Sequence, residues 1–141
     1  MSLDSHTAFD AAREQSLERC CAALEAEIAR QTHVLEVCRE QGRAARLRDV
    51  DALETATREL AKSMNGVLRA EAERLAAVMD AARGLGVGPE DLRLSRLIAH
   101  APEPWRARLV DIQRRLKTVI GITHRLVEAN GRFLRDGART A

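Results

Sequence analysis

The histidines are the first candidates for acid–base chemistry, and their spacing does not support it. A general base needs its partner within hydrogen-bond reach, yet only His6 has a serine or cysteine at helical spacing, Ser2 four residues before it. The fourth lies beside the apolar row of the last helix, which indicates a surface residue flanking that row. The four are His6, His33, His100 and His124.

The cysteines are three in number, so Cys20, Cys21 and Cys38 cannot all pair with one another. Cys21 lies on an apolar stripe, where cysteine behaves as a small hydrophobic residue. His33 and Cys38 are five residues apart, which on a helix points them in different directions. The pattern therefore predicts reduced thiols in a core and no metal site.

The sequence also lacks the complete motifs of phosphate-binding loops and of di-iron sites. Gly84, Gly86 and Gly88 resemble part of a phosphate loop, but they follow a helical pattern and lack the Gly-Lys-Ser/Thr ending. The acidic residues do not form the repeated Glu-x-x-His pairs of di-iron bundles. We therefore expect no catalytic residue, no cofactor and no enzyme activity.

The residue types are those of closely packed helices. The chain has 141 residues, which is about one domain, and 45% of them are hydrophobic. It contains 24 Ala and 21 Arg but only 2 Lys and no Tyr, and Ala, Leu, Arg and Glu are strong helix formers. No apolar run is long enough to cross a membrane, and no signal-peptide pattern opens the sequence. We expect an all-α, soluble, cytoplasmic protein.

The charges are unevenly divided along the chain. Residues 1–91 carry 12 basic and 17 acidic side chains, whereas residues 92–141 carry 11 and 4. The basic last third could attract nucleic acid, an acidic partner, or the acidic helices of the same chain. Its Arg and Lys residues occupy several flanks of the last helix and aromatic residues are nearly missing, which makes nucleic acid the least favoured partner.

Helical periodicity and breakers predict three long helices and a short one, at about residues 5–41, 50–83, 89–99 and 104–136. Gly42 is a natural C-terminal stop for the first helix, and Asp49 or Asp51 can cap the second. These elements predict an elongated antiparallel bundle of three long helices, with the short helix in the connection before the last one. We expect residues 1–141 to form a single domain. The apolar stripe of the second helix reads Leu53, Thr57, Leu60, Met64, Val67, Leu75, Val78 and Ala82.

The last helix carries the clearest pattern, a row of a/d positions that predicts a coiled-coil-like seam. Its spacing alternates between four and three residues through four heptads. Asn130 stands in this row, where a polar residue costs stability and either fixes register or contacts a partner. Ile120, Val127 and Leu134 recur every seven residues beside the row and widen it into a face that could hold a partner helix. The row consists of Trp105, Leu109, Ile112, Leu116, Val119, Thr123, Leu126, Asn130 and Phe133.

Two segments carry a family resemblance that extends from the first long helix to Leu134. The segment Val127-Glu128-Ala129-Asn130-Gly131-Arg132-Phe133-Leu134 is similar to the Asn-x-x-Asn-Gly-x-Leu-Leu/Ile segment of the FlgN family of flagellar type III export chaperones. Asp49-Val50-Asp51-Ala52-Leu53, which follows the break after Gly42, resembles the Gly-Asp-x-x-x-Leu hinge of that family. Val127 replaces the first Asn, the hinge has extra residues, and the family's Lys in the second helix has no match near Leu60.

The resemblance implies a cytosolic helical chaperone that uses no nucleotide or metal. It would bind the C-terminal helical segments of the hook–filament junction proteins, keep them unassembled and deliver them to the export apparatus. The residues expected to contact the client are Ile120, Val127, Asn130, Gly131, Phe133 and Leu134. The alternatives are a generic helical adaptor that self-associates through its seam and, less favoured, a basic nucleic-acid-binding bundle.

Overall fold

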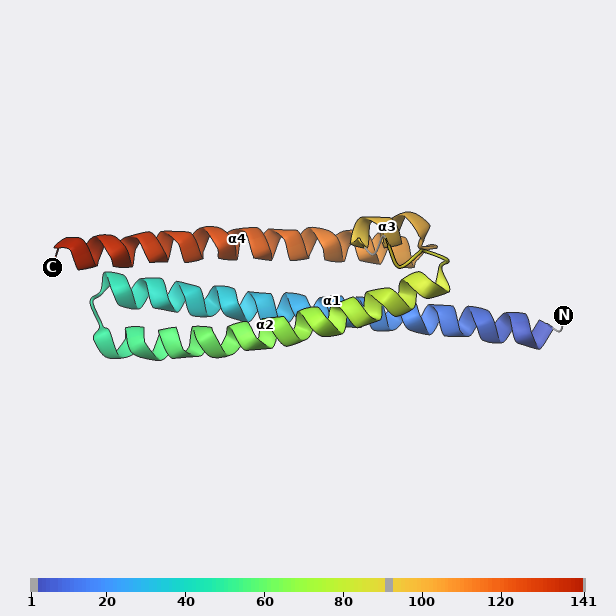
Figure 1. Cartoon of the computed structure of the whole chain (residues 1–141), viewed down its shortest axis with the longest axis horizontal. Helices are drawn as coiled ribbons and strands as arrows, with labels where there is room; N and C mark the ends of the chain where they lie inside the picture. Colours follow the sequence, from blue (N-terminus) through green and yellow to red (C-terminus); the bar gives the residue numbers. More distant parts are fainter. Residues whose placement is uncertain (1–2, 91–92, 141) are drawn as a thin grey trace. The chain divides into compact units, whose positions relative to one another are not determined.

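The computed structural model describes residues 3–90 and 93–140, and over these residues the protein is all-helical, as predicted. Its helices are α1 (Leu3–Arg46), α2 (Val50–Gly84), α3 (Leu94–His100) and α4 (Trp105–Thr140), as shown in Figure 1. The arrangement as one elongated three-helix bundle stays a prediction.

Contacts group the chain into two compact units. Unit 1 comprises residues 1–27 and 70–115, and unit 2 comprises residues 28–69 and 116–141. Each of the three long helices therefore contributes one segment to each unit. The single domain expected over residues 1–141 stays a prediction.

The first helix does not stop at Gly42, which corrects the sequence prediction. It continues to Arg46, and the left-handed residue that ends it is Arg48, at φ 55°. The amides of Arg48 and Asp49 donate to the carbonyls of Ala45 and Ala44, which is the Schellman pattern. The Asp49 carboxylate then accepts from the amide of Ala52 at 3.1 Å, so that Asp49, rather than Asp51, caps α2.

The other helix boundaries agree with the sequence to different degrees. The second helix ends at Gly84, as the glycine cluster predicts, and Gly86 supplies a φ of 74° just after it. The short helix begins at Leu94 rather than Pro89, and residues 89–90 form a turn. The last helix continues past Asp136 and Gly137 and ends at Thr140. A glycine inside a helix lowers its stability but does not by itself end it.

Unit 1 joins the α4 segment to the α1 segment through ion pairs. The Arg108 guanidinium donates to the Glu18 carboxylate at 2.8 Å, and Arg115 lies 3.6 Å from Glu25. Both pairs join residues 90 positions apart, so the two segments run parallel. The hydrogen bond from Arg108 holds the pKa of Glu18 below its usual range. Part of the basic last third therefore contacts acidic residues of the same chain.

A buried carboxylate lies in the core of unit 1. Glu27 is only 1% exposed, and its Oε2 lies 2.7 Å from Nε of Arg74 on α2. Neither atom has a hydrogen-bond partner, so the contact is an ion pair only. Burial raises the pKa of Glu27; Arg74 opposes that rise and Glu71 adds to it. Burial disfavours the charged form of a carboxyl group, and here it outweighs the single cation.

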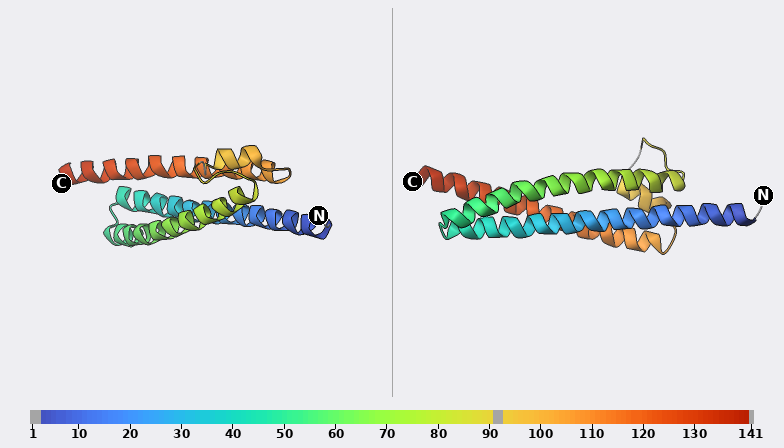
Figure 2. Two further views of the ribbon diagram at one scale, coloured as in Figure 1. Left: turned by 45° about the vertical axis from the view of Figure 1, so that its right-hand side comes forward. Right: turned by 90° about the horizontal axis from the view of Figure 1, so that it is seen from below.

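Unit 2 places the α1 segment between the segments of α2 and α4 (Figure 2). Its core cluster consists of Val34, Cys38 and Val67, with Leu60 of α2 and Leu126 of α4 packed against it. The α2 segment runs antiparallel to α1, since Gln41 pairs with Thr57 while His33 pairs with Glu59. Both flanking helices thus bury an apolar face on the same stripe of α1.

A chain of polar side chains crosses all three segments of unit 2. The Asn130 amide donates to the backbone carbonyl of Cys38 at 2.8 Å and to the Gln41 carbonyl oxygen at 3.4 Å. The Gln41 amide in turn donates to the Thr57 hydroxyl at 3.3 Å. These bonds satisfy a buried amide that would otherwise destabilise the fold by about 1–3 kcal/mol.

Gly42 leaves the space that Asn130 occupies. A Cβ atom at position 42 would lie 2.7 Å from Oδ1 of Asn130. Real Cβ atoms essentially never approach another atom so closely, so Asn130 or the helix would have to move. Gly42 therefore serves a close approach between α1 and α4 inside unit 2 and does not act as a helix stop.

We predict that Gly42→Ala destabilises the protein. An exposed helix-interior glycine changed to alanine normally adds about 1 kcal/mol of stability, whereas here the methyl group displaces a buried hydrogen-bonding side chain. The expected loss is about 1–3 kcal/mol, measured by urea unfolding followed by circular dichroism. The Gly42→Ala/Asn130→Ala double variant should recover part of it, because the clash is gone. Strictly additive effects would show that the two positions do not interact.

Glu27→Gln should change the pH dependence of stability. Because the folded pKa of Glu27 lies above its ordinary value of 4.5, the folded state binds more protons just above that pH. The free energy of unfolding of the parent then falls as pH rises through the window between the two pKa values. The Gln variant lacks this contribution, so its stability relative to the parent should rise over the same window. Chemical unfolding at several pH values measures the difference, and a constant difference would refute it.

Candidate functional site

The six residues expected to contact a client all lie on the α4 segment of unit 2, and they differ in exposure. Three large apolar side chains are open to solvent, with exposed fractions of 45% for Val127, 49% for Phe133 and 36% for Leu134. Ile120, one heptad before Val127, is half-buried. Two turns of helix therefore present apolar side chains that the chain itself leaves uncovered.

Asn130 lies beneath this surface, with 5% of its area exposed. The sequence left open whether it fixes register or contacts a partner. Its bonds to Cys38 and Gln41 make it a register-fixing residue in the isolated chain. Val127 and Leu134 lie three residues before and four residues after it, so they occupy the same side of α4.

Gly131 differs from Gly42 because nothing in the chain's own packing requires it. A Cβ atom there would meet only Nη1 of Arg135, at 3.3 Å, which is the movable end of a flexible side chain. A glycine inside a helix costs about 1 kcal/mol relative to alanine. The residue is half-buried and lies next to Val127 and Leu134 on the helix surface. It leaves the α4 backbone accessible between two apolar side chains.

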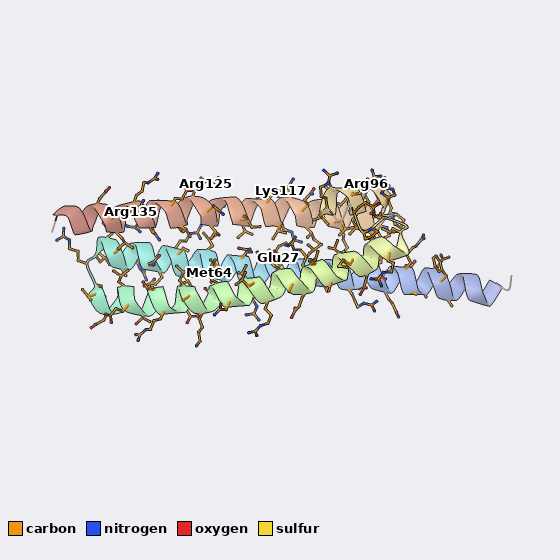
Figure 3. All side chains as sticks on the ribbon, viewed as in Figure 1. Glu27, Met64, Arg96, Lys117, Arg125 and Arg135 are labelled. Carbon is orange, nitrogen blue, oxygen red and sulfur yellow. The ribbon has the colours of Figure 1, made fainter. Side chains whose placement is uncertain are left out.

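Exposed apolar side chains also occur on α2, along the apolar stripe that periodicity predicts for this helix. Val67, Val78 and Ala82 of the predicted stripe are buried, but Met64 (Figure 3) is 46% exposed and Leu75, in unit 1, is 53% exposed. These two residues share the stripe and yet stay exposed, because a stripe on one helix can be wider than the face its neighbours cover.

The exposed edge of α2 in unit 2 borders the polar chain that ends on Asn130. Thr57, Leu60 and Met64 are spaced three and four residues apart and share one face. Thr57 reaches Gln41, and Leu60 packs on the same core cluster as Leu126 of α4. Leu68, one turn after Met64, is 62% exposed. We call the combination of Leu60, Met64 and Leu68 with Ile120, Val127, Phe133 and Leu134 the apolar face of unit 2.

Two features of the sequence could have indicated the exposed apolar residues of α2. Met64 and Leu68 are one turn apart on the outer edge of an amphipathic helix, and the Leu60–Leu68 row contains more apolar residues than a two-sided core needs. Neither signal states which apolar residues stay uncovered, because coverage depends on where α1 and α4 lie.

The reactive side chains are held in the cores. Cys20, Cys21 and Cys38 are free and buried, as the core-thiol interpretation predicted. Burial, with a smaller contribution from Cys21, raises the pKa of Cys20 to about 12, and burial also raises the pKa of Cys38. Such thiols are poor nucleophiles because the thiolate is the reactive form. His124 is exposed, as expected of a flanking residue.

The described part of the chain offers neither a metal cluster nor a membrane-spanning helix. Within residues 3–90 and 93–140, no group of three or more His, Cys, Asp or Glu side chains is placed to hold a metal ion. In the same residues, no helix combines the length and apolar character needed to span a bilayer. The described part of unit 2 exposes large apolar side chains.

Comparison with known proteins identifies the family. Residues 16–140 match the family described as FlgN protein, a range that includes the exposed apolar residues of α2 and α4 in unit 2 and the Asn130 contact. No curated protein and no solved structure matches the sequence. The match confirms the resemblance carried by the Asn130-Gly131 segment. The chain therefore belongs to the FlgN family, whose members are flagellar type III export chaperones of the cytoplasm and not enzymes.

Proposed function

We propose that the protein binds the C-terminal helical segments of the hook–filament junction proteins on the apolar face of unit 2, and keeps those proteins unassembled until export. The observation that carries this proposal is the exposure of Val127 and Leu134 on one flank of the buried Asn130 contact, with Phe133 exposed on its other flank. Family membership supports the class of client. An assembly helix is itself amphipathic, so its apolar side would be covered on the chaperone.

The free energy available from burying the exposed α4 side chains indicates that α2 residues also contact the client. Fully burying a Val, Leu or Phe side chain contributes about 1.5–3 kcal/mol, and the three α4 residues are already about half covered. Together they would supply roughly 2–4 kcal/mol, whereas micromolar binding corresponds to about 8 kcal/mol. We therefore propose that Met64 and Leu68 of α2, which are also exposed, add apolar contacts to a client helix.

Truncation of the α4 residues should weaken client binding. We expect Val127→Ala, Phe133→Ala and Leu134→Ala each to lower the affinity for the client about fivefold or more, because each removes roughly 1 kcal/mol of buried apolar area. The probe is the C-terminal peptide of each junction protein of the same organism, titrated by calorimetry.

Val110→Ala is the matched control. It is the same change on the same helix, at a residue 49% exposed but in unit 1. Equal losses for Val110→Ala and Val127→Ala would argue against a localised site. A folded protein that binds neither peptide would refute the proposed function, and the self-associating adaptor would then be tested by sedimentation.

Gly131→Ala should have opposite effects on stability and on binding. The free protein has room for the methyl group, so the melting temperature should rise by a few degrees, as about 1 kcal/mol of helix propensity predicts. A client helix packed between Val127 and Leu134 would meet that methyl group, and affinity should fall. Thermal unfolding and the same titration supply the two readouts. A variant that is more stable and binds the peptide unchanged would exclude Gly131 from the contact surface.

A further inference from the structure

Six cations of α4 fall into two groups that differ in their partners, while Arg106 donates to the Ala101 carbonyl and Arg114 pairs with Asp111. Arg108 and Arg115, in unit 1, form ion pairs with Glu18 and Glu25 of α1. The second group, in unit 2, consists of exposed side chains for which the described residues supply no ion pair. Its members are Lys117, Arg125, Arg132 and Arg135.

These four side chains lie in one row, which we call the cationic stripe. With 3.6 residues per turn, they fall within a sector of about 80° on the side of α4 opposite the buried a/d row. Figure 3 shows Lys117 and Arg125 on the side of α4 that is turned away from α1. Glu128 is the only acidic residue between positions 112 and 135. The stripe extends roughly 27 Å along a straight helix.

The chemistry of the stripe is purely electrostatic. Gly121 and the exposed, acidic Glu128 lie within it, no large apolar side chain interrupts it between Lys117 and Arg135, and the aromatic residues of α4 lie elsewhere. A protein partner that binds tightly normally buries apolar or aromatic anchors, which this surface does not offer. Single-stranded nucleic acid would need aromatic side chains for stacking. A straight row of cations that lies on a nucleic-acid duplex would contact phosphates only where the row crosses one of the strands.

We propose that the cationic stripe binds the surface of a bilayer containing anionic phospholipids. A plane of headgroups meets all four cations of a straight helix at the same time, without apolar anchors. Each basic side chain near such a surface contributes about a fivefold gain in partitioning. Four cations, partly offset by Glu128, together give on the order of a hundredfold, which is weak, reversible binding of the kind that salt screens. The chaperone would thus be held at the membrane through one side of α4.

The test is sedimentation of the full chain with lipid vesicles, without any client peptide, so that its result is independent of the proposed chaperone function. Vesicles of phosphatidylcholine alone are compared with vesicles containing about a third phosphatidylglycerol. Binding is measured at about 0.1 M and about 1 M salt, between which the screening length falls from about 10 Å to about 3 Å. We expect binding to the anionic vesicles at low salt only.

Two variants with the same loss of charge locate the site. The stripe variant carries Lys117→Gln, Arg125→Gln, Arg132→Gln and Arg135→Gln. The control carries Lys62→Gln, Arg39→Gln, Arg58→Gln and Arg69→Gln, which are also exposed and without an ion pair in the described residues. Circular dichroism checks that both fold. The stripe variant should lose binding a hundredfold or more, to background, and the control should keep most of it.

Three results would overturn the proposal. The first is the absence of binding to anionic vesicles by the parent at low salt. The second is an equal loss in the two variants, which would make net charge rather than the stripe responsible. The third is stripe-dependent binding to a short nucleic-acid duplex, run in parallel, with no vesicle binding.

Discussion

The contact between Asn130 and the α1 backbone at Cys38 is the constraint on which the rest of unit 2 depends. A buried side-chain amide must find its partners, and only one axial position of α4 gives Asn130 the Cys38 carbonyl, the Gln41 side chain and the space left by Gly42. Sliding α4 by one turn would bury the amide unpaired. Because Val127 and Leu134 are about one turn from Asn130, the same contact fixes the axial position, relative to α1, of the exposed apolar side chains of α4.

The sequence predicted this arrangement only in part, and the missing part is nonlocal. The heptad row placed Asn130 in the seam, and the structure buries it. Gly42 was predicted to be a helix stop, since a glycine after an apolar period is the usual local sign of a C-cap. The residue that decides its role is 88 positions away, and no local pattern contains that information. The residue that adopts the left-handed conformation is Arg48, and arginine has no preference for that conformation.

A similar limit explains why the candidate site was found on α4 and missed on α2. Periodicity shows which side chains share a face of a helix, but not whether a second helix covers that face. On α4 the apolar residues outnumber the positions of a narrow seam, so an excess was visible in the sequence. On α2 the excess was hidden, because Met64 fitted the core pattern as well as Val67 did. Only the positions of α1 and α4 in unit 2 separate the two: Val67 joins the cluster with Val34 and Cys38, and Met64 does not.

The division of the α4 cations has the same origin as the division of its apolar residues. Arg108 and Arg115 occupy positions adjacent to the seam and reach carboxylates of α1, whereas the cations of the stripe are on the far side of the helix, beyond the reach of α1. The seam of such a helix is buried in the core, and two further sides of the helix remain exposed. On α4 of unit 2, one of these is apolar, around Val127 and Leu134, and the other is cationic, around Arg125 and Arg132. Because the two point in different directions, a client helix and an anionic surface would not compete for the same side chains, and both could be held at once.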